Sequence, residues 1–328
     1  MAVKLAAETG GCVEGAESGG GQTAPAALIH FMYPPEFEYF SPKDLESAVA
    51  LLSEHGEEAK VLAGGQSLIP LLKLRLSGPR VLVDINRIAS LAGFEERDDT
   101  VVFGALCRHA DIESSSLLAA KLPILTDAAM LTADVQVRNR GTMAGSLAHA
   151  DPAGDWAPAL FALEATVTIR GPRGERTLSV EDFFQDAYTP DLSPDELLTH
   201  VTVPLPKPPA FGAYLKFERR AGDFAVASAG VQLRLDNRGA CQDVRIGLGA
   251  LGPTAVRARK AEQTLNGLEP SPDRIVEATA AIQEDIHPFE DIRGSVEYKR
   301  HLAGVVFEKA LSVALGRSRG ERVTLPHL

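Results

Sequence analysis

Two short segments, 63–67 (AGGQS) and 140–146 (RGTMAGS), consist largely of small residues that leave the backbone accessible. Each presents successive main-chain N–H groups, and concave runs of such groups bind phosphate. Glycine also permits a positive φ and lets the backbone approach a ligand closely. Two such segments facing each other would suit a diphosphate. On residue types alone, a pair of ordinary tight turns is the alternative.

Two charged residues further along the chain could act on the same ligand. Asp155 could accept hydrogen bonds from ribose or other hydroxyl groups, although a cap for the helix WAPALFAL is the alternative. Lys216 lies in YLKFERR, a predicted strand. Beside a ring that gains negative charge, its ammonium group would stabilise that charge. A solvated position on the face of the strand is the simpler interpretation.

Motifs for several other kinds of chemistry are absent from the sequence. No GxGxxG follows a predicted strand and no GxxxxGK[ST] occurs, so the Rossmann and P-loop fingerprints are missing. There is no GxSxG and no HExxH. Ser67, Ser146 and His149 have no spacing that indicates a nucleophile and its base.

The three cysteines, Cys12, Cys107 and Cys241, lie far apart and form no CxxC. A Cys-ligated iron–sulfur cluster needs about four thiolates, so this chain cannot hold one. A structural zinc site is not indicated, and no metal is expected. We interpret the cysteines as isolated buried thiols.

The composition indicates a globular protein without a nucleic-acid or membrane partner. The 328 residues are enough for two or three domains, and 45% hydrophobic with 23% charged residues is ordinary. The net charge of −11 and the lack of a long basic run argue against nucleic acid and anionic membranes. No apolar stretch is long enough for a membrane span, and the first residues lack the apolar core of a secretory signal. We therefore expect a cytoplasmic protein.

The elements that must position the small-residue segments begin after residues 1–31, which are rich in Gly, Ala, Ser and Glu and are predicted to be a disordered tail. SPKDLESAVALLSEHG predicts a helix with Ser41 at its N-cap and Gly56 at its end. AKVLAGG predicts a strand that runs into the first segment. LIPLLKLRLSG follows as a helix or an irregular apolar stretch.

The remaining pattern is one of strands followed by helices. RVLVDIN, TVVFGALC, ERTLSVEDFF and ELLTHVTVP predict strands, and HADIESSSLLAAKLPILTDAAMLTA is helical. The second small-residue segment lies in a stretch that we expect to be a loop, before a helix and a strand. PLPKPPA, 204–210, is the best linker candidate. Three strands and three helical patterns follow it, which is typical of an α+β domain.

These residues carry a resemblance to a known family. LAGGQSLIPLLKLRL together with QVRNRGTMAGSLAHADPAGDWAPAL resembles the FAD-binding medium subunit of the molybdenum hydroxylases, the carbon monoxide dehydrogenase and xanthine dehydrogenase family. The match continues through ELLTHVTVP, RIGLGALGPTAVRARKAEQTLNG and YKRHLAGVVFEKAL, and it covers about residues 32 to 317. It implies an α+β fold: an FAD-binding domain, 32–206, in two α/β subdomains split near residue 90, then a C-terminal domain, 207–328, of three strands followed by helices.

The resemblance also implies which residues bind FAD. The segment that matches 63–67 would wrap the pyrophosphate with backbone N–H groups, and the one that matches 142–146 would hold it from the other side. Asp155 would bind the cofactor's polar chain, Lys216 would lie near the flavin, and Leu198, preferred over Leu197, would pack there. Tyr188 is the candidate for the aromatic residue beside the isoalloxazine ring, with an ordinary packed tyrosine as the alternative. The full set is Ala63, Gly64, Gly65, Gln66, Ser67, Leu68, Thr142, Met143, Ala144, Gly145, Ser146, Asp155, Tyr188, Leu198 and Lys216.

Two positions depart from the family pattern. Ala144 stands where the family usually has glycine in Thr-Ile-Gly-Gly. If that position requires a left-handed backbone, cofactor binding weakens by about 1 kcal/mol. Cys107 stands where the family often has a hydroxyl residue, so a side-chain hydrogen bond to the cofactor is in doubt there.

The function implied by the resemblance is that of an electron-transfer subunit. A partner large subunit with a molybdenum cofactor would hydroxylate the substrate, and a small subunit with two [2Fe–2S] clusters would pass electrons to FAD. The flavin carries the redox chemistry, so no catalytic side chain is expected. The substrate and the external acceptor, a quinone, NAD or oxygen, are left open. The alternatives are a cofactor-free assembly or interaction protein, motivated by Ala144, and a free-standing flavin oxidoreductase.

Overall fold

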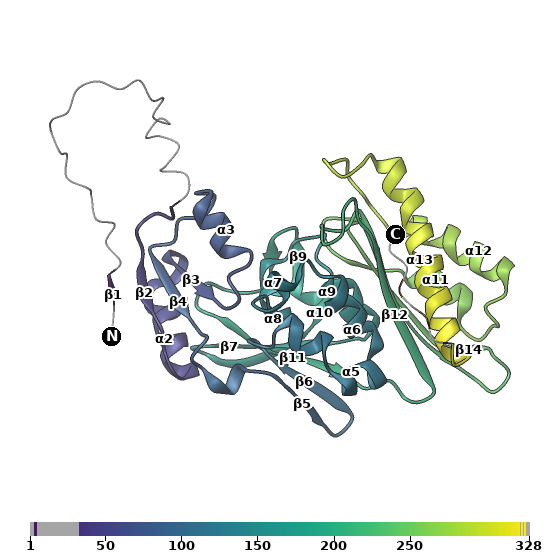
Figure 1. Ribbon diagram of the computed structural model, residues 1–328, viewed down its shortest axis with the longest axis horizontal. Helices are drawn as coiled ribbons and strands as arrows, with labels where there is room; N and C mark the ends of the chain where they lie inside the picture. The colour runs from purple at the N-terminus through teal and green to yellow at the C-terminus, as the bar shows by residue number, and fades with distance from the viewer. Residues whose placement is uncertain (1–2, 5–32, 322, 324, 326–328) are drawn as a thin grey trace, which may run out of the picture.

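The computed structural model describes residues 3–4, 33–321, 323 and 325. Figure 1 shows three sheets in a row along the long axis of the molecule, in chain order. The predicted tail, 1–31, lies outside the described residues apart from β1 (Val3–Lys4), which pairs with β2 (Glu38–Phe40) and so belongs to a sheet. Among the described residues no helix is long and apolar enough to cross a membrane.

The first sheet ends at the first small-residue segment. Its strand order is β1-β2-β4-β3, and both β2 and β3 (Ala59–Leu62) run parallel to β4 (Val81–Asp84). Residues 63–67 then lead into α3 (Leu68–Lys73). The predicted strand and turn are therefore confirmed.

Helix α2 (Leu45–His55) covers this sheet with one apolar face, which buries Ala48 and Leu52. Its N-cap is Asp44, whose carboxylate accepts a hydrogen bond of 2.8 Å from the backbone N–H of Ser47. The prediction of Ser41 as the cap was wrong by three residues, because Asp44 supplies the acceptor that the first turn requires. A 3-10 turn, η1 (Gly56–Glu58), leads from α2 to β3.

The second sheet is antiparallel throughout, in the order β5-β6-β11-β7-β8. An α/β description therefore fits only the first part of this domain. The two parts share one hydrophobic core, to which Val83 and Phe103 both belong. The strands and the small β9–β10 pair are β5 (Phe94–Arg97), β6 (Thr100–Gly104), β7 (Thr166–Gly171), β8 (Gly174–Ser179), β9 (Phe184–Asp186), β10 (Thr189–Pro190) and β11 (Leu197–Pro204).

Helices pack around this sheet, and two of them lie in the stretch that we expected to be a loop. Both α7 and the start of α8 fall in residues 134–146, so the expectation was wrong there. Asp134 and Thr142 each cap a short helix in a stretch whose composition resembles that of a turn. The helices are η2 (Ala89–Leu91), α4 (His109–Glu113), α5 (Ser116–Lys121), α6 (Pro123–Leu131), α7 (Val135–Arg138), α8 (Met143–His149), α9 (Trp156–Ala162) and α10 (Val180–Phe183).

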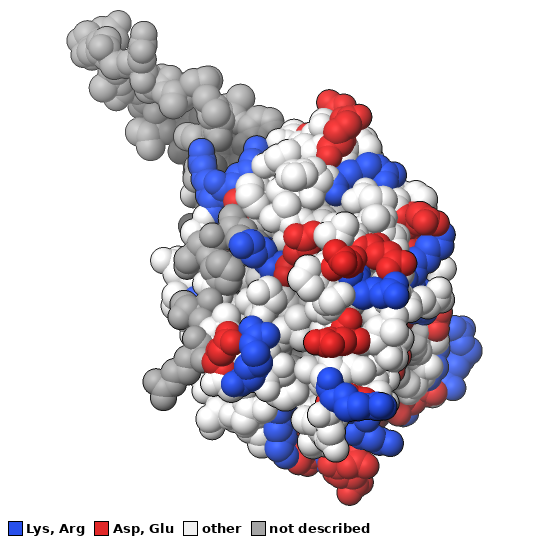
Figure 2. Space-filling model, turned by 90° about the vertical axis from the view of Figure 1, so that its right-hand side faces the viewer, with Lys and Arg blue, Asp and Glu red and all other residues white. Residues whose placement is uncertain are grey.

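The third sheet, β12-β13-β14-β15, is antiparallel and lies after the 204–210 connection. Its strands are β12 (Ala210–Phe217), β13 (Ala227–Leu235), β14 (Cys241–Gly249) and the short β15 (Val256–Arg257), a fourth strand that the sequence pattern did not reveal. The helices that follow are α11 (Arg259–Leu265), α12 (Pro272–Ala281), η3 (Ile282–Glu284) and α13 (Val296–Ser318). On the face shown in Figure 2, Lys and Arg side chains alternate with Asp and Glu and form no basic patch.

The third sheet is covered on both faces. Helices α11 and α13 contact it on one side, and α6 and α9 of the preceding domain contact it on the other. Helix α9 lies very close to the strands, because a Cβ at Gly230 would come 2.8 Å from the carbonyl oxygen of Pro158 and one at Gly247 would overlap it. The glycines thus allow the two domains to pack backbone against sheet.

A buried ion pair also joins the domains. Arg317, in the last turn of α13, donates two hydrogen bonds of 2.7 and 2.8 Å to the carboxylate of Asp127 on α6. The same carboxylate accepts the backbone N–H of Tyr214 at 3.1 Å. Asp127 is buried, so its charge depends on these donors.

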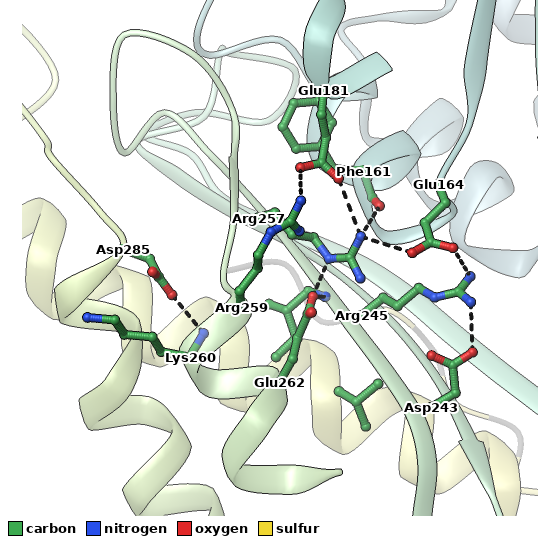
Figure 3. Close-up of polar contacts among 12 residues, drawn as sticks. Phe161, Glu164, Glu181, Asp243, Arg245, Arg257, Arg259, Lys260, Glu262 and Asp285 are labelled. Atoms are coloured by element: carbon green, nitrogen blue, oxygen red, sulfur yellow. Dashed lines mark hydrogen bonds and ion pairs between the residues drawn. The ribbon is translucent and has the colours of Figure 1, made fainter. Parts of the chain in front are cut away.

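A second polar cluster links the domains near β15 (Figure 3). The buried guanidinium of Arg257 lies between Glu262 of its own domain and Glu164 and Glu181 of the preceding one. Arg245 on β14 also pairs with Glu164, at 3.1 Å. The relative position of the two domains is therefore held by charge pairs as well as by apolar packing.

Replacement of Arg317 by leucine is expected to lower the free energy of unfolding by about 3 kcal/mol, because it leaves the buried Asp127 carboxylate without its cation. Urea unfolding of the whole chain measures this. The control is Arg319→Leu on the same helix end, since Arg319 is exposed and pairs with Glu321 at the surface, where the loss is about 0.5 kcal/mol or less. Equal losses in the two variants would contradict the role given to the Asp127–Arg317 pair.

Candidate functional site

The two small-residue segments are in direct contact. Gly64 is buried, and a Cβ there would overlap the carbonyl oxygen of Arg140 and lie 2.8 Å from the Cα of Gly141. Gly65 has a φ of +76°, which a residue with a side chain adopts only with strain. Backbone meets backbone here, and no side chain lies between the segments.

The first segment has unused hydrogen-bond donors. Among the described residues, no acceptor lies within hydrogen-bond distance of the backbone N–H groups of residues 64–67, whereas the carbonyl oxygen of Gly65 accepts from Ile69 at 3.0 Å. Gln66 is exposed, and Ala63, Ser67 and Leu68 are half-buried. Main-chain donors that the protein leaves unpaired beside a surface are suited to an anion.

The second segment is the start of a helix. The hydroxyl of Thr142 accepts the backbone N–H of Gly145 at 3.0 Å and caps α8. A Cβ at Gly145 would come 2.7 Å from that hydroxyl, so glycine suits the cap. Gly145 is exposed and Ser146 is half-buried, which leaves the helix start accessible at these two residues.

Ala144 and Met143 point into the core, with exposed fractions of 3% and 1%. Ala144 lies inside α8 and is not among the residues with positive φ. The penalty that the sequence predicted for a left-handed alanine therefore does not arise. Helical geometry accepts alanine better than the glycine of the family pattern.

A side-chain network ties the two segments together. Asn86 donates from Nδ2 to the carbonyl oxygen of Ala63 at 2.8 Å, and it accepts from Nη2 of Arg108 at 2.5 Å. Arg108 also donates from Nη1 to the carbonyl oxygen of Arg140 at 2.5 Å. Sequence reasoning missed these residues. The only signal for them was a pair of polar residues, Asp84 and Asn86, at the end of β4.

His109 packs against the second segment. Its backbone N–H donates to the carbonyl oxygen of Gly141 at 3.1 Å, and its ring stacks on Trp156 at 5.3 Å between centroids. Burial, with smaller effects of Arg108 and Arg138, lowers the pKa of His109 to about 3. The imidazole is therefore neutral at physiological pH.

Asp155 and Lys216, singled out separately in the sequence, are in contact across the domain boundary. The Nζ of Lys216 lies 3.3 Å from Oδ1 of Asp155, and the hydroxyl of Tyr214 donates to the same oxygen at 2.7 Å. Asp155 does not cap α9 with its side chain, and Lys216 is 2% exposed, so the simpler alternative for each residue is wrong. Burial raises the pKa of Asp155, and Lys216 and Tyr214 oppose that shift.

The ammonium group of Lys216 has further partners. It donates to the carbonyl oxygen of Asp223 at 2.7 Å and lies 3.1 Å from a carboxylate oxygen of Glu218. Its positive charge is therefore fixed in position by the protein. A buried lysine held in this way can act on a neighbouring group by its charge.

Tyr188 and Leu198 lie in different surroundings. Tyr188 is 59% exposed, has a φ of +56°, and donates from its hydroxyl to Asp151 at 3.1 Å. Its ring lies 5.4 Å from that of His149, at the far end of α8 from the cap. This strained, exposed position is not that of an ordinary packed tyrosine. Leu198 and Leu197 are both buried on β11, which contacts α8.

The thiols take no part in this arrangement. Burial raises the pKa of Cys107 to about 12 and that of Cys241 to about 11, so both are protonated. Cys12 lies outside the described residues. In the part of the chain that the structure describes, no group of three or more His, Cys, Asp or Glu residues could hold a metal ion.

The chain matches two family models. The FAD binding domain in molybdopterin dehydrogenase matches residues 35–206, and the CO dehydrogenase flavoprotein C-terminal domain matches residues 212–314. The carbon monoxide dehydrogenase medium chain of Hydrogenophaga pseudoflava is 40% identical over 87% of this chain and 99% of its own length. The 6-hydroxypseudooxynicotine dehydrogenase complex subunit alpha of Paenarthrobacter nicotinovorans is 38% identical over 90% of this chain and 100% of its own length.

The fold is also that of solved structures. A chain of the carbon monoxide dehydrogenase of Hydrogenophaga pseudoflava that lacks the Mo-pyranopterin moiety superimposes with a TM-score of 0.85. The two chains are 42% identical, with 87% of this chain and 99% of the other covered. The residues at the two segments fit the FAD that the family model names. The first segment has unpaired N–H groups that suit a diphosphate, and glycine lets the second segment lie directly against it.

Replacement of Gly64 by alanine is expected to push the two segments apart, because the added methyl group overlaps the Arg140 carbonyl. FAD affinity, measured by fluorescence titration of the flavin-free chain, should fall by about 100-fold or more, the equivalent of about 3 kcal/mol. Gly78→Ala is the matched control, since its Cβ would meet only the side chain of Pro35 at an ordinary 3.7 Å. Unchanged FAD affinity in Gly64→Ala would show that the contact does not shape the site.

His109 is also expected to make stability depend on pH. Its pKa is about 3 in the folded chain and near 6.5 when unfolded, so between these values only the unfolded chain binds the proton. The free energy of unfolding then falls by up to about 1.4 kcal/mol per pH unit as the pH is lowered from 6.5 towards 3. His109→Phe keeps an aromatic ring against Trp156 and removes this titration. Urea unfolding of both proteins at several pH values gives the slope of the unfolding free energy against pH. The slopes of the two proteins should differ by the equivalent of about one proton, and equal slopes would contradict the role of His109.

Proposed function

Since this chain belongs to the family of FAD-binding medium subunits of the molybdenum hydroxylases, we propose that it is the electron-transfer flavoprotein of a heteromeric molybdenum hydroxylase. It is an FAD-dependent oxidoreductase subunit. The contact between Gly64 and the Arg140–Gly141 peptide carries the proposal, because it places the unpaired backbone N–H groups of 64–67 beside the start of α8.

The residues of the chain have distinct roles in this proposal. The N–H groups of 64–67 bind the diphosphate, and the start of α8 holds it from the other side. Tyr214 and Lys216 fix the Asp155 carboxylate, which has further lone pairs for hydroxyl groups of the cofactor's polar chain. Tyr188 and Leu198 lie beside the ring.

When bound, FAD supplies the redox chemistry, since it can take up and release electrons one at a time. The buried ammonium group of Lys216 provides a fixed positive charge that favours negative charge on a neighbouring ring. No proton transfer by a side chain of this protein is required.

The partners follow from the division of labour in such complexes. Relatives are named as medium chains or as subunits of complexes, and the three cysteines of this chain cannot ligate an iron–sulfur cluster. We assign substrate hydroxylation to a large subunit with a molybdenum cofactor. Electrons then reach FAD through two [2Fe–2S] clusters on a small subunit, and leave it for an external acceptor.

The observation that suggested a cofactor-free protein no longer supports that alternative, because Ala144 occupies an ordinary helical position. A free-standing flavin oxidoreductase is the second candidate. It is less well supported, since the relatives named above are subunits of larger enzymes.

Purification of the full chain with its co-purifying partners should give a complex with about one FAD per copy of this chain, as expected for a single cradle. Visible absorption spectra and acid extraction of the flavin measure this. Absence of flavin would contradict the proposal. Turnover of a small substrate and an acceptor by the chain alone, without partners, would favour the free-standing oxidoreductase instead.

A further inference from the structure

Arg108 lies at the junction of the two segments of the cradle. Its Nη1 donates to the carbonyl oxygen of Arg140, which is the atom that a Cβ at Gly64 would overlap. Its Nη2 donates to Asn86, and Asn86 holds the carbonyl oxygen of Ala63. One guanidinium group thus connects both segments through a single intermediate side chain.

The other side of this connection is anchored in the first sheet. Asp84, at the end of β4, accepts the backbone N–H of Asn86 at 2.9 Å and its Nδ2 at 2.6 Å. The hydroxyl of Tyr39, on β2, donates to the second oxygen of Asp84 at 2.5 Å. The orientation of Asn86, and with it that of Arg108, is therefore fixed by residues on two strands of the first sheet.

Among the described residues, the carboxylates of Asp111 and Asp84 act on the positive charge of Arg108 from beyond ion-pair distance. Among the described residues, no carboxylate oxygen lies within 4.0 Å of its guanidinium nitrogens, and both of its hydrogen-bond acceptors there are neutral. The group is half-buried, and burial lowers its pKa; the nearby Arg140 adds to the shift, and Asp111 and Asp84 oppose it. Within the described part of the chain, Arg140 has no carboxylate within 4.0 Å either. Two like charges beside a cradle of N–H groups are stabilised when an anion binds between them.

We propose that Arg108 is a positioning residue for the FAD diphosphate. Its hydrogen bonds hold the two segments of the cradle together, and its positive charge balances the charge of the diphosphate. The inference rests on the proposed function. Asn86 is the second residue of this arrangement, because it bonds to both Arg108 and the carbonyl oxygen of Ala63.

Arg108→Gln removes the charge and the fork of donors, and it tests the proposal in the flavin-free full chain. The dissociation constant for FAD should rise by about 10- to 100-fold, the range expected for charge-assisted hydrogen bonds. That for riboflavin, which has no phosphate, should change by less than about threefold on the same scale. The dependence of FAD affinity on salt should also become shallower than in the wild type, because a charge near the anion is lost.

Two further variants separate the effect of the hydrogen bonds that link the two segments from the effect of the charge of Arg108. Arg108→Lys keeps the charge without the planar fork, so it should keep the salt dependence and lose less FAD affinity than Arg108→Gln. Asn86→Asp places a carboxylate against Arg108 and removes the donor to Ala63, so it should weaken FAD binding and flatten the salt dependence. Arg238→Gln is the control for a lost positive charge, because the Arg238 side chain is 91% exposed on a distant turn, and it should bind FAD like the wild type.

The outcomes are distinct. Selective loss of FAD affinity with a shallower salt dependence supports the proposal. Equal losses for FAD and riboflavin, or no loss, overturn it and leave Arg108 with a structural role or none. If Arg108→Gln does not fold, Arg108→Lys and Asn86→Asp decide by the same comparison. Failure of the wild-type chain to bind FAD would instead refute the proposed function.

Discussion

The contact of backbone against backbone at Gly64 is the constraint on which the site depends. The turn after β3 belongs to the first sheet, and the Arg140–Gly141 peptide leads into α8 beside the second. Each additional methyl group between them would separate the N–H donors of 64–67 from the start of α8. The shared hydrophobic core that holds the two sheets together is therefore also what brings the donors within reach of one ligand.

The C-terminal domain contributes to the cofactor site that we propose. Its first strand, β12, contributes Tyr214 and Lys216 to the buried carboxylate of Asp155. This contact requires β12 to lie in a fixed position, which the Asp127–Arg317 pair and the close packing of α9 on the glycines of the sheet ensure. A domain with no cofactor motif of its own thus supplies charged and polar groups to the proposed cofactor site.

Some buried charged residues are neutralised by partners within the chain, whereas another has a charge that a bound anion would neutralise. The buried groups Asp127, Asp155 and Lys216 all have partners of opposite charge within the chain, and His109 avoids the cost of burial because it is neutral. Arg108 differs, since it is half-buried beside the cradle with neutral acceptors only among the described residues. That imbalance is the feature that a bound diphosphate would remove.

The sequence by itself determined the local elements and the family. The strand of AKVL, the glycine turn after it and the long motifs around both segments depend on residues close in the chain, whose periodicity and backbone preferences can be read directly. Only the tertiary structure decided that Ala144 lies in a helix capped by Thr142, that Lys216 is buried against Asp155, and that Arg108 ties Arg140 to Asn86. These contacts join residues far apart in the chain, and their geometry follows from how the sheets pack, which no local pattern encodes.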